Sequence, residues 1–163
     1  MTTVAINYNE DGNIVIASDS RMTGKGTILS KDCVKIFEIQ FTDNEKAYVT
    51  GAGSYAHVLA FLDWVVEGMD PDKFPKDYME REALLITKDG VVTFDDYPRG
   101  MPVTLPASCG SGDHIAGRMV AGATPEEAVK IAAEYDPFTD SNVVSYVIEL
   151  EKKKKPKRKK KGA

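Results

Sequence analysis

The strongest constraint on the fold of this chain is a repeated pattern in which two apolar stretches of strand length flank a short turn. Segments 2–19, 33–53 and 82–94 all show it, with EDGN, FTDNE and KDG between the stretches. Gly, Asn and Asp accept the backbone angles of tight turns, and short connections join antiparallel strands. The sequence therefore predicts three β-hairpins and a fold rich in antiparallel sheet.

Two blocks of sequence have a helical period instead. Residues 54–70 place apolar side chains three and four positions apart behind Ser54, a plausible N-cap, and a second block covers 112–135. Within it, Thr124, Pro125 and Glu127 form the signature of a capping box.

After the second helical block, 142–150 predicts a last strand, whereas PRGMPVTLP at 98–106 is typical of a loop. Strands in hairpins with helices in two blocks favour an α+β fold, in which helices cover the outer faces of antiparallel sheets.

The charge of the chain is divided between a body and a tail. All 25 acidic residues precede position 152, and KKKKPKRKKK at 152–161 holds 9 of the 21 basic ones, which leaves residues 1–151 with a net charge of −13. A run of like charges buries no surface, so we expect one domain at 1–151 and a disordered basic tail at 152–163. Four roles stay open for the tail: solubilising or self-docking, nucleic-acid binding, binding of an acidic protein, or a nuclear address.

Cysteine usage and hydropathy bear on the compartment. Cys33 and Cys109 lie far apart, and only His57 and His114 add further soft ligands, so neither a zinc site nor a disulfide framework is indicated. No apolar run approaches the roughly 20 residues that span a bilayer, and the start lacks the pattern of a secretion signal. We therefore expect a cytoplasmic protein without a membrane segment.

The two threonines behind Met1 raise a chemical question. Threonine is common in strands, which is the simpler explanation. Removal of Met1 would instead give Thr2 a free α-amine with a pKa of about 7.7–8.0, suited to take the proton of its own hydroxyl. Both explanations stay open for this pair alone.

Two charged residues in apolar surroundings bear on that question. Asp19 ends an apolar strand and Lys35 interrupts CVKIF, where an unpaired charge is costly. They either neutralise each other or point to solvent from an edge. An ammonium beside the Thr2 hydroxyl would lower the pKa of that hydroxyl, and amides of GAGS at 51–54 could face an anion.

Five segments, TTVAI, GNIVIASDSRMT, VKIFEI, GAGSYAH and SCGSGDHIAGRMV, occur in the order found in proteasome β-type subunits. Over most of residues 2–150 the chain resembles this family, especially the bacterial peptidase HslV. The resemblance implies an N-terminal-nucleophile (Ntn) hydrolase: a four-layer αββα sandwich of two antiparallel sheets with threonine endopeptidase activity. HslV has a second long helix where this chain has only segment 69–83, so we expect a shortened helical layer.

The resemblance also implies roles for individual positions. Thr2 matches the nucleophile, Asp19 and Lys35 match the charged residues beside it, Gly53 matches an oxyanion-hole glycine, and Ser111 matches the serine near the threonine amine.

Two further groups are implied in the same way. Asp136 and Thr139 match a supporting loop that in some relatives ligates a cation, so the resemblance implies no required cofactor but allows a monovalent or divalent structural cation there. Met22, Cys33 and Gly51 match the pocket for the residue that precedes the cleaved bond, and imply an apolar, uncharged specificity.

The implied partners are a peptide or unfolded protein substrate and further copies of the chain, with a ring as one form of homo-oligomer. An ATP-dependent unfoldase is not presumed, because the tail follows the strand at whose end HslV docks onto its ATPase. Two other functions stay open: an inactive scaffold that keeps Met1 and binds nucleic acid or an acidic partner through 152–161, and a small-molecule amidase of the same fold.

Overall fold

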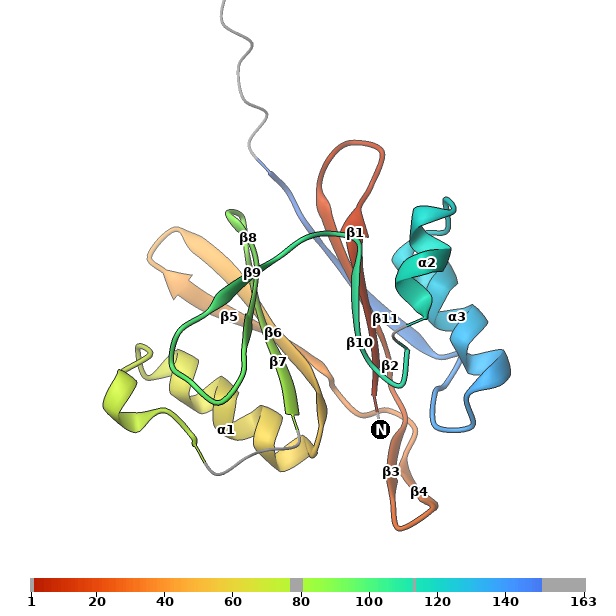
Figure 1. The fold of residues 1–163 in the computed structure, drawn as a ribbon, viewed down its shortest axis with the longest axis horizontal. Coiled ribbons are helices and arrows are strands. Elements are labelled where there is room, and N and C mark those ends of the chain that lie inside the picture. Colours follow the sequence, from red (N-terminus) through yellow and green to blue (C-terminus); the bar gives the residue numbers. More distant parts are fainter. Residues whose placement is uncertain (1, 77–80, 113, 151–163) are drawn as a thin grey trace, which may run out of the picture.

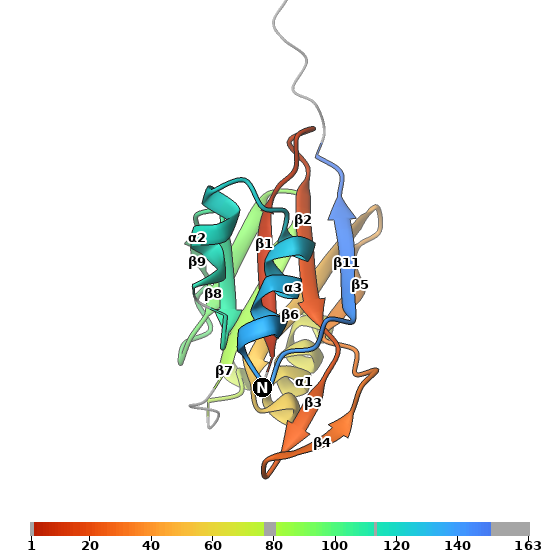
Figure 2. The same ribbon diagram turned by 90° about the vertical axis from the view of Figure 1, so that its right-hand side faces the viewer.

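The computed structural model describes residues 2–76, 81–112 and 114–150, so the predicted tail at 152–163 lies outside the described residues. Two antiparallel sheets face each other, and each is covered on its outer face by helix (Figures 1 and 2). The predicted four-layer αββα arrangement is thereby confirmed.

The first sheet contains the start of the chain. Its order is β10-β1-β2-β11, built from Ala107–Gly110, Thr3–Tyr8, Ile14–Asp19 and Val143–Ile148. Two helices, α2 (Ile115–Val120) and α3 (Pro125–Tyr135), pack on its outer face through a core that includes Ala5, Ala17 and Val129. Strand β11, the predicted last strand, pairs with β2 from Val143 to Ile148.

The second sheet has the order β5-β6-β7-β8-β9. Its strands are Ile36–Thr42, Glu45–Gly53, Arg81–Thr87, Gly90–Phe94 and Met101–Val103. Helix α1 (Tyr55–Val66) packs on its outer face through Phe61, Trp64 and Val65. A 3₁₀ turn at Pro71–Lys73 is the other helical element between α1 and β7 in the described residues, as the shortened helical layer requires.

The three predicted hairpins are confirmed as β1/β2, β5/β6 and β7/β8. Segment 22–30, punctuated by glycines, forms a separate small hairpin of β3 (Met22–Gly24) and β4 (Thr27–Ser30). The prediction of a loop over 98–106 was wrong for 101–103, which pair with β8 as β9. Pro102 is tolerated there because β9 is the edge strand of its sheet.

Alternation along β1 decides which face each N-terminal side chain occupies. Val4 and Ile6 belong to the core between the two sheets, whereas Ala5 belongs to the core beneath α2 and α3. Because successive side chains point to opposite faces of a strand, Thr2 faces the space between the sheets and Thr3 faces the helices.

In the described part of the chain, no helix has the length and apolarity needed to cross a membrane.

The capping box at the start of α3 is confirmed. The Thr124 hydroxyl accepts from the Glu127 amide at 3.2 Å, and the Glu127 carboxylate accepts from the Thr124 amide at 2.8 Å. We expect Thr124→Ala to lower the free energy of unfolding by about 1 kcal/mol, measured by urea denaturation. Ser54, the N-cap of α1, makes no side-chain capping bond, so Ser54→Ala is the matched control and should cost less. Equal losses in the two variants would contradict this account.

Candidate active site

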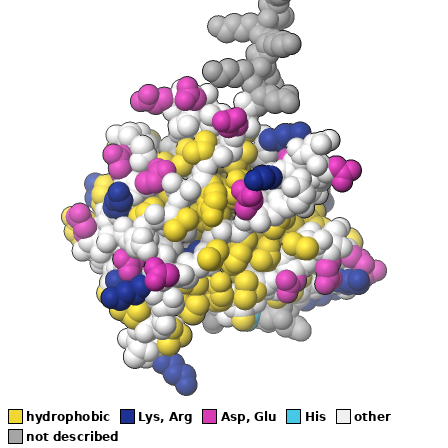
Figure 3. Space-filling model, turned by 180° about the vertical axis from the view of Figure 1, so that it is seen from behind, with side chains coloured by type: hydrophobic (Ala, Val, Ile, Leu, Met, Phe, Trp, Pro, Cys, Tyr) yellow, Lys and Arg dark blue, Asp and Glu magenta, His cyan; other side chains and the backbone are white. Residues whose placement is uncertain are grey.

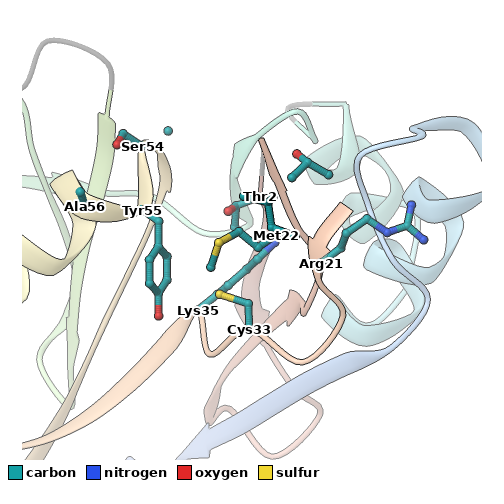
Figure 4. A pocket seen from close by; sticks show the side chains of 11 residues that line it. Thr2, Arg21, Met22, Cys33, Lys35, Ser54, Tyr55 and Ala56 are labelled. Carbon is teal, nitrogen blue, oxygen red and sulfur yellow. The ribbon is translucent and has the colours of Figure 1, made fainter. Parts of the chain in front are cut away.

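The predicted nucleophile lies at the edge of a cavity of about 270 Å³. Thr2 and Met22 form one wall, the first turn of α1 with Tyr55 forms the opposite wall, and Lys35 and Cys33 lie below Thr2 and Met22 in the view of Figure 4. Thr2, Lys35 and Gly53, which lie far apart in the sequence, therefore share one cavity.

Lys35 and Asp19 form a buried ion pair. Lys35 Nζ lies 2.8 Å from Asp19 Oδ1, and the two side chains are 3% and 0% exposed. Burial lowers the pKa of Lys35, while the neighbouring Asp19 carboxylate opposes that shift. The sequence left open whether Asp19 and Lys35 pair with each other or point to solvent, and in the structure they pair.

Asp19 is held in place by backbone donors as well. Its Oδ1 accepts from the Thr3 amide at 2.9 Å, and its Oδ2 accepts from the Arg21 amide at 3.1 Å. The carboxylate therefore ties the start of β1 to the end of β2 and directs Lys35 toward the cavity that Thr2 lines.

The backbone of Thr2 is fixed by the turn after β10. The Ser111 amide donates to the Thr2 carbonyl at 3.2 Å. Gly110 precedes it with φ +87°, and a Cβ on Gly110 would lie 1.8 Å from the same carbonyl oxygen. Only glycine permits this approach. Strand β10 itself was not predicted, because its four residues carry no clear alternation.

Ser111 belongs to a hydroxyl and carboxylate network behind Thr2. Its hydroxyl donates to Asp136 Oδ2, which also accepts from the Thr139 hydroxyl at 2.7 Å. The Thr3 hydroxyl, on the helix-facing side of β1, lies 2.6 Å from the Thr139 hydroxyl and 3.3 Å from that of Ser111. Strand alternation predicts that Thr3 points to the face opposite Thr2 and takes no part in the chemistry, and the structure places its hydroxyl on that opposite face.

Burial raises the pKa of Asp136, but the hydrogen bonds that it accepts outweigh burial and hold its pKa below the ordinary value. A carboxyl whose folded-state pKa is depressed contributes stability above its unfolded pKa of about 4, and this contribution is lost as the pH falls through the folded value. We therefore expect the free energy of unfolding to fall less steeply below pH 4 in Asp136→Asn than in the parent. Asp43→Asn, an exposed turn residue, is the matched control; equal slopes for Asp136→Asn and the parent would contradict the prediction.

The pocket prediction needs one correction. Met22 and Cys33 line the cavity, but Gly51 does not. Its missing side chain serves packing within the second sheet, because a Cβ there would lie 2.2 Å from the backbone oxygen of Glu82 on β7. Gly53, at φ +106°, does line the cavity immediately before α1.

Sequence reasoning missed several cavity residues, and two of them make contacts that shape the site. Arg21 donates to the Pro137 carbonyl at 2.8 Å and pairs with Asp140 at 3.3 Å, which links the end of β2 to the 136–140 loop. Tyr55 donates to the Val34 carbonyl at 3.0 Å and faces Cys33 (Figure 4). Both are unremarkable in sequence, so only the fold identifies them.

The structural cation that the resemblance allows at Asp136 and Thr139 would have to share a carboxylate that already accepts hydrogen bonds. Asp136 Oδ1 accepts from the Phe138 amide at 2.9 Å, while Oδ2 takes the two hydroxyls. Among the described residues, no cluster of three or more His, Cys, Asp or Glu is placed to hold a metal. These side chains do not fit a cation well, and the chemistry proposed below uses none.

Similarity to known proteins was found at the level of structure and not of sequence. No family model and no curated protein sequence matches the chain. Among solved structures, Thiobacillus denitrificans BPH in complex with epoxomicin is similar at 21% identity with a TM-score of 0.69, over 93% of this chain and 100% of that one. Eukaryotic HslV from Trypanosoma brucei is similar at 14% identity with a TM-score of 0.61, over 91% and 99%. The chain therefore has the HslV and proteasome-like Ntn fold.

Proposed function

We propose that the chain is a threonine endopeptidase whose nucleophile is Thr2, exposed as the first residue by removal of Met1. The main support for the proposal is the buried Lys35–Asp19 ion pair, because its lysine lines the same cavity as Thr2. A buried charge pair without a function is a weak source of stability, because desolvation offsets the attraction between the charges.

The chemistry follows from the atoms in this cavity. The Thr2 hydroxyl oxygen attacks the peptide carbonyl carbon while the α-amine of the same residue takes the hydroxyl proton. That proton passes to the departing amine as the C–N bond breaks, which leaves an ester on Thr2. Water, deprotonated by the α-amine, then attacks the ester and releases the acyl product as a carboxylic acid, and the proton returns to the Thr2 oxygen.

Two groups stabilise negative charge in this scheme. The Lys35 ammonium favours the ionised form of the nearby hydroxyl, since a neighbouring opposite charge lowers the pKa of an acid. The backbone amide of Gly53, on the wall before α1, is the donor proposed for the oxyanion, and one such donor is typically worth about 10²–10³ in rate. Ser111 and Asp136 act indirectly by fixing the Thr2 backbone and the loops behind it.

The cavity walls support cleavage after neutral, apolar residues. Met22, Leu29, Cys33 and Tyr55 contribute apolar surface. The two cationic residues on the wall, Lys35 and Arg21, are already paired with Asp19 and Asp140. A basic side chain would find no acidic residue among those that line the cavity.

Intact mass and peptide hydrolysis test the proposal together. We expect purified protein to lack Met1, to cleave fluorogenic peptides with an apolar residue before the bond faster than those with Lys, and to be inhibited by epoxomicin. Retention of Met1 with no cleavage would favour the inactive scaffold. Loss of Met1 with hydrolysis of small amides but not of peptides would favour the amidase.

Assembly into a homo-oligomer is part of the same proposal. The edge strands β5 and β11 of the two sheets lie on one face, where hydrophobic side chains gather (Figures 2 and 3). Val144 of β11 is 40% exposed. Open edges of this kind invite pairing with another chain. We propose a ring, and native mass spectrometry should give several copies per particle; a monomer would contradict it.

A further inference from the structure

A second cavity lies at the opposite end of β1 from Thr2. It has a volume of about 440 Å³ and is enclosed by the β1–β2 turn, the connection between α2 and α3, and β11. Tyr8 at the end of β1 lines it and lies six positions along the chain from Thr2, which is roughly 20 Å along an extended strand. The proposed peptidase chemistry does not use this site.

The floor of the cavity is apolar and partly open. Val15, Met119 and Pro125 are buried, while Tyr8 and Val147 are each 50% exposed. Long aliphatic stems can cover such surface while their charged ends stay in water.

The rim of the cavity is acidic. Glu10 and Glu126 are the charged residues that line it, and no Lys or Arg lines it among the described residues. Asp11 and Glu149 are exposed beside it, in the β1–β2 turn and directly after β11. The neighbouring helices hold two basic residues, Arg118 in the last turn of α2 and Lys130 in α3, and neither lines the cavity.

The basic segment of the sequence begins next to this cavity. Val147 lines the cavity, and the Leu150 amide donates to the Asn13 side chain at 3.0 Å, which holds the end of the described chain at the β1–β2 turn. Segment 152–161, with nine Lys and Arg, starts five residues beyond Val147. A ten-residue segment reaches at most about 36 Å when extended, so segment 152–161 is long enough to reach the cavity.

We propose that the basic segment 152–161 binds in this cavity of its own chain. Lysine stems lie over Val147, and their ammonium groups meet the carboxylates of Glu10 and Glu126. A short tether gives an effective concentration in the millimolar range, so weak individual contacts suffice. The body, with its net charge of −13, contributes attraction at longer range.

Carbodiimide cross-linking of the full chain tests this assignment, because it joins a lysine to a carboxylate only in contact. We expect chymotryptic peptides that link 152–161 to Glu10 and Glu126, and at least a fivefold lower yield at 1 M salt, where the Debye length falls to about 3 Å. Mixing isotope-labelled with unlabelled protein separates linkage within one chain from linkage between copies.

The charge-reversed pair Glu10→Lys/Glu126→Lys should increase the rate of tryptic cleavage within 152–161 severalfold. Asp63→Lys/Glu67→Lys, with the same change of net charge at exposed positions in and directly after the last turn of α1, is the matched control and should leave that rate near the parent value. The proposal is overturned if the links spread over exposed carboxylates such as Asp63, if mixed-isotope pairs predominate, or if both variants are cleaved alike.

Discussion

Thr2→Ala should reduce peptide hydrolysis to background, by a factor on the order of 10⁴–10⁶, because it removes the atom that forms the new bond. The fold should persist. The hydrogen bond that anchors this residue runs from the Ser111 amide to the Thr2 carbonyl, and alanine keeps that carbonyl. Initial rates on a fluorogenic peptide and the thermal midpoint, measured on the same preparation, check both parts.

Thr3→Ala is the matched control, since it deletes the same side chain one residue further on. The Thr3 hydroxyl faces the helices and bonds to Thr139 at 2.6 Å, away from the cavity. We expect this variant to lose stability while it keeps most of the turnover per folded molecule. Full peptidase activity in Thr2→Ala, or an equal loss in the two variants, would refute the assignment of the nucleophile.

The parts of the fold that the sequence could predict are those set by local patterns. Hairpins at 2–19, 33–53 and 82–94 follow from local signals, namely alternation and turn residues, and the capping box at Thr124 is equally local. These patterns involve residues close together in the sequence, so they can be recognised without knowledge of the fold.

Tertiary contacts were harder to predict. Pairing of Asp19 with Lys35 was one of two open alternatives, because the pattern shows that a charge interrupts an apolar run but not which way it points. Gly51 was assigned to the pocket by position, yet it serves the approach of β7. Arg21 was assigned no role from the sequence, because it acquires its contacts only when the 136–140 loop folds against β2.

Lys35→Met should have the second largest effect, on stability as well as on activity. It leaves the Asp19 carboxylate buried without its cation, and breaking a buried pair from one side costs about 3–5 kcal/mol. It also removes the positive charge that we propose beside the Thr2 hydroxyl. Urea denaturation should report the first loss, and hydrolysis rates corrected for the folded fraction should report the second.

The double variant Asp19→Asn/Lys35→Met separates the two roles of the lysine. Without either charge, the desolvation cost disappears, and the side-chain amide oxygen introduced at position 19 can still accept from the Thr3 amide that Asp19 holds at 2.9 Å. We expect part of the lost stability to return, because no buried charge is left unpaired, although the Arg21 amide, which donates to Asp19 Oδ2 at 3.1 Å, loses its acceptor. Turnover should not return, since no ammonium would remain to stabilise the alkoxide. A double variant that regained both would make Lys35 a structural residue and remove the main support for the peptidase.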